Sequence, residues 1–182
     1  MEERKSRGRR KPLFLVYLLV EGRGGADLTR KARPLIYITI PVHNEESTIG
    51  VLLWKIRNVL GEFGRDYELL VLDDASTDGT REVLGRYRRT LPLRVFRSEE
   101  RVGYAGALER LIREAVDRAP YPKRDAIATL QGDFTEHPEY LVPLVKSLEG
   151  GADVVAGRLL KCGSQKEPIM TVVDGFDQVF LG

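Results

Sequence analysis

Hydrophobic and polar positions follow two alternating patterns from Pro34 onward. Short runs rich in β-branched residues predict buried strands, and stretches with apolar residues at steps of three and four predict helices. We expect strands at 35–42, 67–72, 93–97, 126–130 and 153–156, and helices at 49–63, 80–89, 103–119 and 138–149. Short connections between alternating strands and helices favour an α/β fold, with a mostly parallel sheet flanked by helices. After Gly157 the pattern fades.

Polar residues stand at the starts of two predicted helices. Ser47 precedes the first helix and Thr80 opens the second. Side-chain oxygens at such positions accept hydrogen bonds from the first backbone N–H groups of a helix. We therefore expect these two residues to act as caps.

The N-terminal segment differs in charge from the rest. Residues 1–34 carry ten Lys/Arg and four Asp/Glu, a net of +6, so the remaining residues net −4 within a total of +2. We predict a basic, disordered arm over residues 1–33 and one folded domain over 34–182. The apolar run at 13–20 is too short to span a bilayer, which needs about 20 residues. It is interpreted either as a peripheral membrane contact made by residues 1–20 or as an extra strand.

Composition excludes several classes of protein. The 182 residues are 42% hydrophobic and 31% charged, which suits one globular domain and argues against a disordered or fibrous chain. The single cysteine, Cys162, excludes an internal disulfide and a cysteine-based zinc site. We expect no nucleic acid partner, because the basic residues precede the folded body and do not line it.

Polar clusters follow three of the predicted strands. They are Asn44-Glu45, Asp73-Asp74 and Asp133. In an open α/β sheet, ligands bind outside the carboxyl ends of the strands. Three clusters at one sheet edge therefore predict a binding site there.

The motifs around these clusters resemble a known family. PVHNEESTIG, LVLDDASTDGT, the pair Gly103 and Ala107, GDFTEHPEYL and ADVVAGR follow one another over about residues 35–160. In this order and spacing they resemble family-2 inverting glycosyltransferases with the GT-A fold. The last two motifs look most like the branch that glycosylates polyprenyl phosphates, including dolichyl-phosphate mannosyltransferases.

The resemblance implies a nucleotide-diphosphate sugar donor and a set of donor-binding residues. Pro41 and Glu45 would frame the nucleoside pocket, and Asp74 would accept from the base N–H. Asp74→Ala is then expected to remove donor binding and leave the fold largely intact. The other donor-site residues implied are His43, which is equally well a plain loop residue, Asp73 beside Asp74, Gly103, Gln131, Gly132 and Asp133.

The resemblance also implies a divalent cation, Mg²⁺ or Mn²⁺, on the donor diphosphate. The family carries Asp-x-Asp after its fourth strand, where this chain has Gln131-Gly132-Asp133. Asp133 matches the metal-binding carboxylate and is a predicted catalytic residue. Gln131 brings no charge but can hydrogen-bond a ribose hydroxyl. Arg101, where many relatives have Asn, is either a phosphate contact or a surface residue.

Arg158 matches a position near the acceptor phosphate in the polyprenyl-phosphate branch, and it is the second predicted catalytic residue. A guanidinium suits phosphate through its planar fork of donors. The acceptor would then be a polyprenyl phosphate or else a hydroxyl group of a glycan or lipid, and the enzyme would work in the cytoplasm or at the cytoplasmic face of the membrane. No general base is assigned, and Asp174 and Asp177 are candidates by position only.

Three functions are weighed. The first is inverting hexosyl transfer, and the second is a nucleotide-sugar-binding module that lacks the acceptor half. The third, a nucleotidyltransferase, is disfavoured, because the loop PVHNEES lacks the glycines and basic residues that hold a triphosphate. The domain over 34–182 is either truncated on its acceptor side or a compact variant.

Overall fold

The structure is a computed structural model that describes residues 13–18, 35–121, 125–150, 154–162 and 165–173, with side chains described at 35–121 and 125–150. The strands are β1 (Leu13–Leu18), β2 (Leu35–Val42), β3 (Asp66–Asp74), β4 (Leu93–Ser98), β5 (Ala126–Thr129), β6 (Val154–Cys162) and β7 (Gln165–Val173). The helices are α1 (Ile49–Phe63), α2 (Thr80–Tyr87), α3 (Gly103–Arg118) and α4 (Leu141–Glu149), with a 3-10 turn, η1 (Pro138–Tyr140), before α4.

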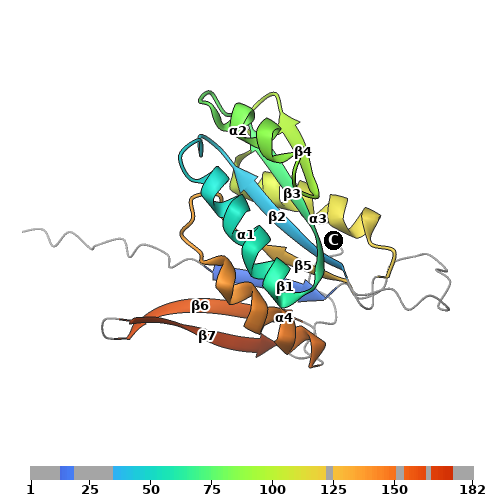
Figure 1. The fold of residues 1–182 in the computed structure, drawn as a ribbon, viewed down its shortest axis with the longest axis vertical. Helices are drawn as coiled ribbons and strands as arrows, with labels where there is room; N and C mark the ends of the chain where they lie inside the picture. The colour runs from blue at the N-terminus through green and yellow to red at the C-terminus, as the bar shows by residue number, and fades with distance from the viewer. Residues whose placement is uncertain (1–12, 19–34, 122–124, 151–153, 163–164, 174–182) are drawn as a thin grey trace, which may run out of the picture.

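The strands form one sheet in the order β4-β3-β2-β5-β1-β6-β7 (Figure 1). The strands β2 to β5 run parallel to one another. Strand β1 is antiparallel to both of its neighbours, and β7 is antiparallel to β6. The predicted fold class, an α/β fold with a mostly parallel sheet flanked by helices, is confirmed.

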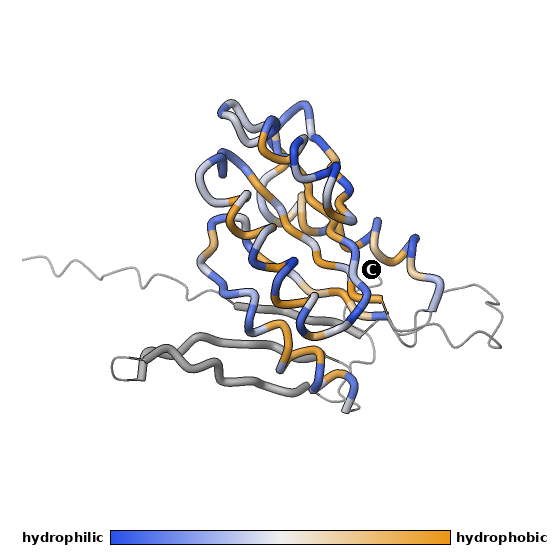
Figure 2. Tube along the Cα trace, in the orientation of Figure 1, coloured by the Kyte–Doolittle hydropathy of each residue, from blue (hydrophilic) through white to orange (hydrophobic). Residues whose placement is uncertain are grey.

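Alternating residues of the central strands pack against opposite layers of helices. Ile36, Ile38 and Ile40 of β2 pack in the cluster that includes the buried residues of α1 and α4. Tyr37 of the same strand packs in a second cluster with Leu111 of α3. Figure 2 shows the hydrophobic residues along the central strands and on the helix faces toward them. The two-sided burial explains why these strands are nearly continuous apolar runs.

The N-terminal apolar run forms a strand of this sheet. Leu13–Leu18 lies between β5 and β6, where Leu15 pairs with both Thr129 and Ala156. Of the two interpretations left open, the extra strand is the one observed, and the predicted disordered arm is wrong for these six residues. The rest of the segment 1–33 lies outside the described residues. Among the described helices, none combines the length and apolar character that a membrane span requires.

Three further expectations needed correction. The N-cap of α1 is Thr48, not Ser47, and the Thr48 hydroxyl donates to the side chain of Glu45 at 2.6 Å. Thr80 is not the cap of α2 but its first residue, because the N-cap is Gly79, and the Thr80 N–H and hydroxyl both donate to Asp78. At the C-terminal end, β6 runs beyond the predicted 153–156, and β7 was not predicted, because its sequence alternates neither strongly nor regularly.

Asp125 ties the start of β2 to the segment that follows α3. Its carboxylate is fully buried, and its Oδ1 accepts from the Leu35 N–H at 2.9 Å. Its Oδ2 accepts from the Tyr121 N–H at 3.1 Å. The two donors are backbone groups, so removing the carboxylate leaves both without this acceptor.

We expect Asp125→Ala to lower the free energy of unfolding by about 3 kcal/mol, because it removes two charge-assisted hydrogen bonds in the interior. Asp125→Asn keeps one oxygen acceptor and is expected to lose roughly half as much. Urea unfolding followed by circular dichroism measures both. An alanine variant as stable as the parent would contradict this account.

Candidate functional site

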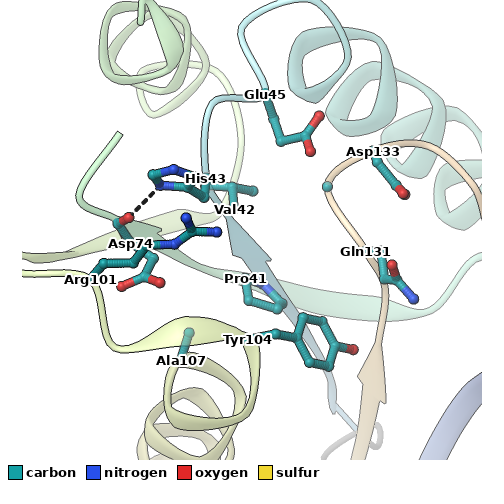
Figure 3. A pocket seen from close by; sticks show the side chains of 11 residues that line it. Pro41, Val42, His43, Glu45, Asp74, Arg101, Tyr104, Ala107, Gln131 and Asp133 are labelled. Carbon is teal, nitrogen blue, oxygen red and sulfur yellow. Dashed lines mark hydrogen bonds between the residues drawn. The ribbon is translucent and has the colours of Figure 1, made fainter. Parts of the chain in front are cut away.

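A pocket of about 210 Å³ opens at the carboxyl ends of β2, β3 and β5 (Figure 3). The segment after β2, the end of β3, the start of α3 and the loop after β5 all contribute to it. The lining residues are Pro41, Val42, His43, Glu45, Asp74, Arg101, Tyr104, Ala107, Gln131, Gly132 and Asp133. The three polar clusters predicted to meet at one sheet edge therefore do meet, and each contributes a carboxylate, from Glu45, Asp74 and Asp133.

Hydrogen bonds join the loop after β2 to the loop after β3. The Asn44 N–H donates to Ser76 Oγ, and Asn44 Oδ1 accepts from the Thr77 N–H at 2.8 Å. The Glu45 N–H donates to Thr80 Oγ1 at 2.8 Å. Asn44 and Ala75 both adopt left-handed backbone conformations, with φ of 56° and 54°. The polar residues of these two motifs thus shape the loops, and most of them do not line the pocket.

His43 lines the pocket and is fixed from the opposite loop. Its Nδ1 lies 2.7 Å from the carbonyl oxygen of Asp74, and a carbonyl can only accept. Nδ1 therefore carries the proton, and Nε2 is left as an acceptor, for the Asn44 side-chain amide at 3.4 Å. The ring is held in one tautomer and one orientation.

Asp74 holds the start of α3. Its Oδ1 accepts from the Val102 N–H at 2.7 Å and its Oδ2 from the Gly103 N–H at 2.8 Å. Gly103 has φ of 77°, a conformation that favours glycine. A carboxylate at a helix N-terminus accepts from N–H groups that have no partner within the helix, and its negative charge is attracted to the positive end of the helix dipole. Two of its roughly four acceptor positions stay available for a ligand.

Two predicted site residues with described side chains, Asp73 and Gly103, do not line the pocket. Asp73 is buried beside it, where Oδ1 accepts from the Ser76 N–H at 2.9 Å and Oδ2 lies 3.7 Å from Arg97. Gly103 belongs to the turn held by Asp74. Arg158 lies in β6, where its backbone pairs with Leu13 of β1, and its side chain is outside those described.

The triplet after β5 comes close to the end of β2. A Cβ added at Gly132 would lie 2.6 Å from Cγ1 of Val42, so this close approach requires glycine. Asp133 is exposed, and its Oδ1 accepts from the Thr135 N–H at 2.9 Å. Within the described part of the chain, no group of three or more His, Cys, Asp or Glu side chains is arranged to hold a metal ion.

Glu136 is a buried carboxylate that the sequence did not single out. It is 1% exposed, and its two oxygens accept from the backbone N–H of Gln131 at 2.8 Å and from Gln131 Nε2 at 3.4 Å. Burial is the main cause that raises the pKa of Glu136 to about 7, and the charge of Asp133 adds to it. The pattern GDFTEHPEY offers a signal only in its density of acidic residues.

Arg101 and Tyr104 complete the α3 side of the pocket, and Tyr104 was not predicted. Arg101 points across the pocket mouth near His43 and Asp74 (Figure 3). His137, by contrast, packs edge-on against Phe134 and Tyr140 at ring distances of 5.7 and 5.9 Å. The pocket therefore combines three carboxylates with one guanidinium and one aromatic ring.

Comparison with known protein families shows which family the chain belongs to. The model of glycosyl transferase family 2 matches residues 37–173, more than half of the chain. The chain belongs to glycosyl transferase family 2. The matched region contains most of β2 and every described strand and helix that follows it. β1 lies outside the matched region. The resemblance read from the motifs is confirmed, and with it the GT-A fold class.

Curated relatives share 29% identity with this chain. One is a dolichol-phosphate mannosyltransferase from Pyrococcus furiosus, matched over 129 residues, 70% of this chain and 34% of the relative. Another is a dodecaprenyl-phosphate galacturonate synthase from Rhizobium johnstonii, matched over 62% of this chain and 32% of the relative. The chain thus spans about a third of the length of these relatives. A solved mannosyltransferase from Pyrobaculum calidifontis, in complex with GDP-Man and Mn²⁺, aligns at 26% identity and TM-score 0.48 over 69% of this chain and 36% of its own.

The contacts of Asp74 add a loss of stability to the expectation that Asp74→Ala leaves the fold largely intact. The variant loses both acceptors at the start of α3 and is expected to be about 2 kcal/mol less stable than the parent. Chemical denaturation measures this loss, with Glu100→Ala, an exposed change in the preceding loop, as the control. Equal stability of the parent and Asp74→Ala would show that the cap contributes nothing.

The raised pKa of Glu136 predicts a pH dependence of stability. Between the ordinary value of 4.5 and about 7, the folded protein holds a proton that the unfolded chain releases. The stabilisation is therefore complete below pH 4.5 and is lost as the pH rises through 7. As the pH rises from 4.5 to about 7, the free energy of unfolding of the parent should fall by roughly 3 kcal/mol more than that of Glu136→Gln.

Denaturant unfolding at a series of pH values tests this, with the exposed Glu62→Gln as the matched control. The control should follow the parent at every pH. Parallel curves for the parent and Glu136→Gln would contradict the assignment.

Proposed function

We propose that this chain carries the donor site of an inverting glycosyltransferase that uses a nucleotide-diphosphate sugar. The observation that carries the proposal is the convergence, in one pocket, of the family's donor motifs from three separate strand ends. All the residues predicted to bind the donor line that pocket, except Asp73 and Gly103.

The lining residues fit the parts of such a donor. Asp74 has acceptor positions left for a base N–H, and Glu45 offers a carboxylate to the base or the ribose. Tyr104 offers an aromatic face to a base, and Arg101 a planar donor fork to a phosphate. Their positions on different elements would fix the orientation of the nucleotide.

The donor set suits a hard divalent cation, Mg²⁺ or Mn²⁺, bound together with the diphosphate. Asp133 is the exposed carboxylate at the pocket, and the donor phosphates and water would complete the oxygen ligands. When bound, such a cation neutralises charge on a diphosphate leaving group. Asp133 is the residue that would hold it, and Gln131 adds no charge beside it.

For the acceptor we propose a polyprenyl phosphate. The support is the names of the curated relatives, which act on dolichol phosphate and dodecaprenyl phosphate, together with Arg158 in the motif that resembles this branch. A phosphate is ionised at neutral pH and needs no strong general base, whereas a hydroxyl does. An acceptor of this kind lies in a membrane, which favours action at the cytoplasmic face of a membrane.

A donor-binding module without transfer is the second candidate. The observation that favours it is that the motif residues gathered in the pocket are those expected to bind the donor, and none of the described side chains is assigned to an acceptor. Incubation with a sugar donor and a short polyprenyl phosphate separates the two. Lipid-linked sugar indicates the transferase, and donor binding without product indicates the module.

Binding of metal and donor is expected to be coupled. One protein carboxylate is a weak site for a hard cation, so Mn²⁺ alone should bind poorly, and each partner should raise the affinity of the other by the same factor. Calorimetric titration of UDP-, GDP- and TDP-sugars with and without Mn²⁺ measures this factor. Asp133→Asn should abolish it.

The exposed Asp117→Asn on α3, outside the pocket, is the matched control and should keep the coupling. Tight Mn²⁺ binding to the protein without donor, or donor affinity indifferent to a chelator, would refute the proposed metal site. If no sugar nucleotide bound under any condition, the proposed function itself would fail.

A further inference from the structure

Among the hydrogen bonds of the described residues, Glu136 makes two to a residue that lines the pocket, and both are to Gln131. Its backbone N–H lies 2.8 Å and its Nε2 lies 3.4 Å from the Glu136 carboxylate oxygens. Glu136 is 1% exposed and does not line the pocket, whereas Gln131 does. Through these two bonds Glu136 can act on a ligand by way of Gln131.

The contact decides which end of the Gln131 amide a ligand meets. An amide side chain has one acceptor oxygen and one donor nitrogen, and an ionised carboxylate only accepts. Glu136 therefore holds Nε2, which leaves Oε1 as the end that faces a ligand. Figure 3 shows the Gln131 side chain at the pocket, on the loop that follows β5.

We propose that Glu136 is a positioning residue, which orients the Gln131 amide so that Oε1 accepts a hydrogen bond from a ribose hydroxyl of the donor. The inference rests on the proposed nucleotide-sugar function and deepens it. Glu136 touches no ligand itself. It selects for a ribonucleotide through the direction of one neighbouring acceptor.

The charges near the triplet favour this role over a second metal ligand at residue 131. A carboxylate at 131 would meet the buried carboxylate of Glu136, and like charges at such distances disfavour ionisation of both. A neutral amide avoids that repulsion and still offers an acceptor. For this reason a Gln131→Asp substitution is not expected to strengthen metal binding.

The test compares ribonucleotides with their deoxy analogues. UDP and GDP, each with its 2′-deoxy and 3′-deoxy form, are titrated calorimetrically with Mg²⁺ at pH 8.5, where a carboxyl with a pKa of about 7 is ionised. The parent should bind the ribonucleotide about 5- to 10-fold more tightly than the analogue that lacks the contacted hydroxyl.

Three variants isolate the amide direction. In Glu136→Gln, the oxygen of the new amide accepts from the backbone N–H of Gln131, and its nitrogen faces the Gln131 side chain. Because that nitrogen donates, the Gln131 amide rotates to present its oxygen to residue 136 and its nitrogen to the pocket. The ribose preference should then fall to about 1-fold. The exchanged pair Gln131→Glu/Glu136→Gln presents a carboxylate oxygen to the pocket in either rotation and should recover the preference. Glu139→Gln, an exposed change in the same segment, should keep it.

Thermal melts establish that each variant is folded. Gln131→Leu removes the acceptor itself and shows the ribose preference that remains without it. If Glu136→Gln keeps the parent's preference, or if the exchanged pair is folded and does not recover it, the positioning role is refuted. A parent that binds UDP or GDP without preferring ribose refutes the inference and leaves the proposed function standing. A parent that binds neither nucleotide nor any sugar nucleotide refutes the proposed function.

Discussion

The pocket depends on the hydrogen bonds that join the loop after β2 to the loop after β3. Parallel strands bring these loops to one sheet edge, but they do not fix loop conformation. The Asn44 side chain accepts from the Thr77 N–H, and the Asp78 side chain accepts from the N–H groups of Glu46 and Thr80. In the other direction, the N–H groups of Asn44 and Glu45 donate to the hydroxyls of Ser76 and Thr80. The polar motif residues are therefore mainly structural, and the ligand-facing positions are the few side chains that this framework leaves pointing inward.

Sequence patterns predicted the parallel half of the sheet well. The run at 35–42 and the helix at 49–63 match β2 and α1 as observed, because two-sided burial imposes strong apolar patterns. The caps were harder. Ser47 and Thr48 are adjacent hydroxyl residues, and the sequence does not show that the helix begins after Thr48, whose hydroxyl donates to Glu45 and makes no side-chain cap bond. β7 escaped prediction because a strand near a sheet edge needs no continuous apolar run.

The candidate site was predictable where residue type and strand end coincide, as for Glu45, Asp74 and Asp133. The hydrogen-bond partners of these carboxylates within the protein were not predictable. A carboxylate at a strand end suggests a ligand, yet both oxygens of Asp74 already accept from α3, and Asp73 is buried against Ser76. Glu136 was missed for the opposite reason, since a glutamate in a polar turn is usually exposed and here it is enclosed.

The place of β1 in the sheet has a consequence for how the protein folds. Leu15 pairs with Thr129 and Ala156, so the strand that leaves the ribosome before the other six must wait for partners more than a hundred residues later. Pairings this distant in sequence form slowly, because loop closure precedes any gain from the contact. Until then both edges of an apolar strand are unpaired, which is the state in which chains associate with one another. We expect the yield of soluble protein to depend on synthesis rate and on chaperones more than its final stability would indicate.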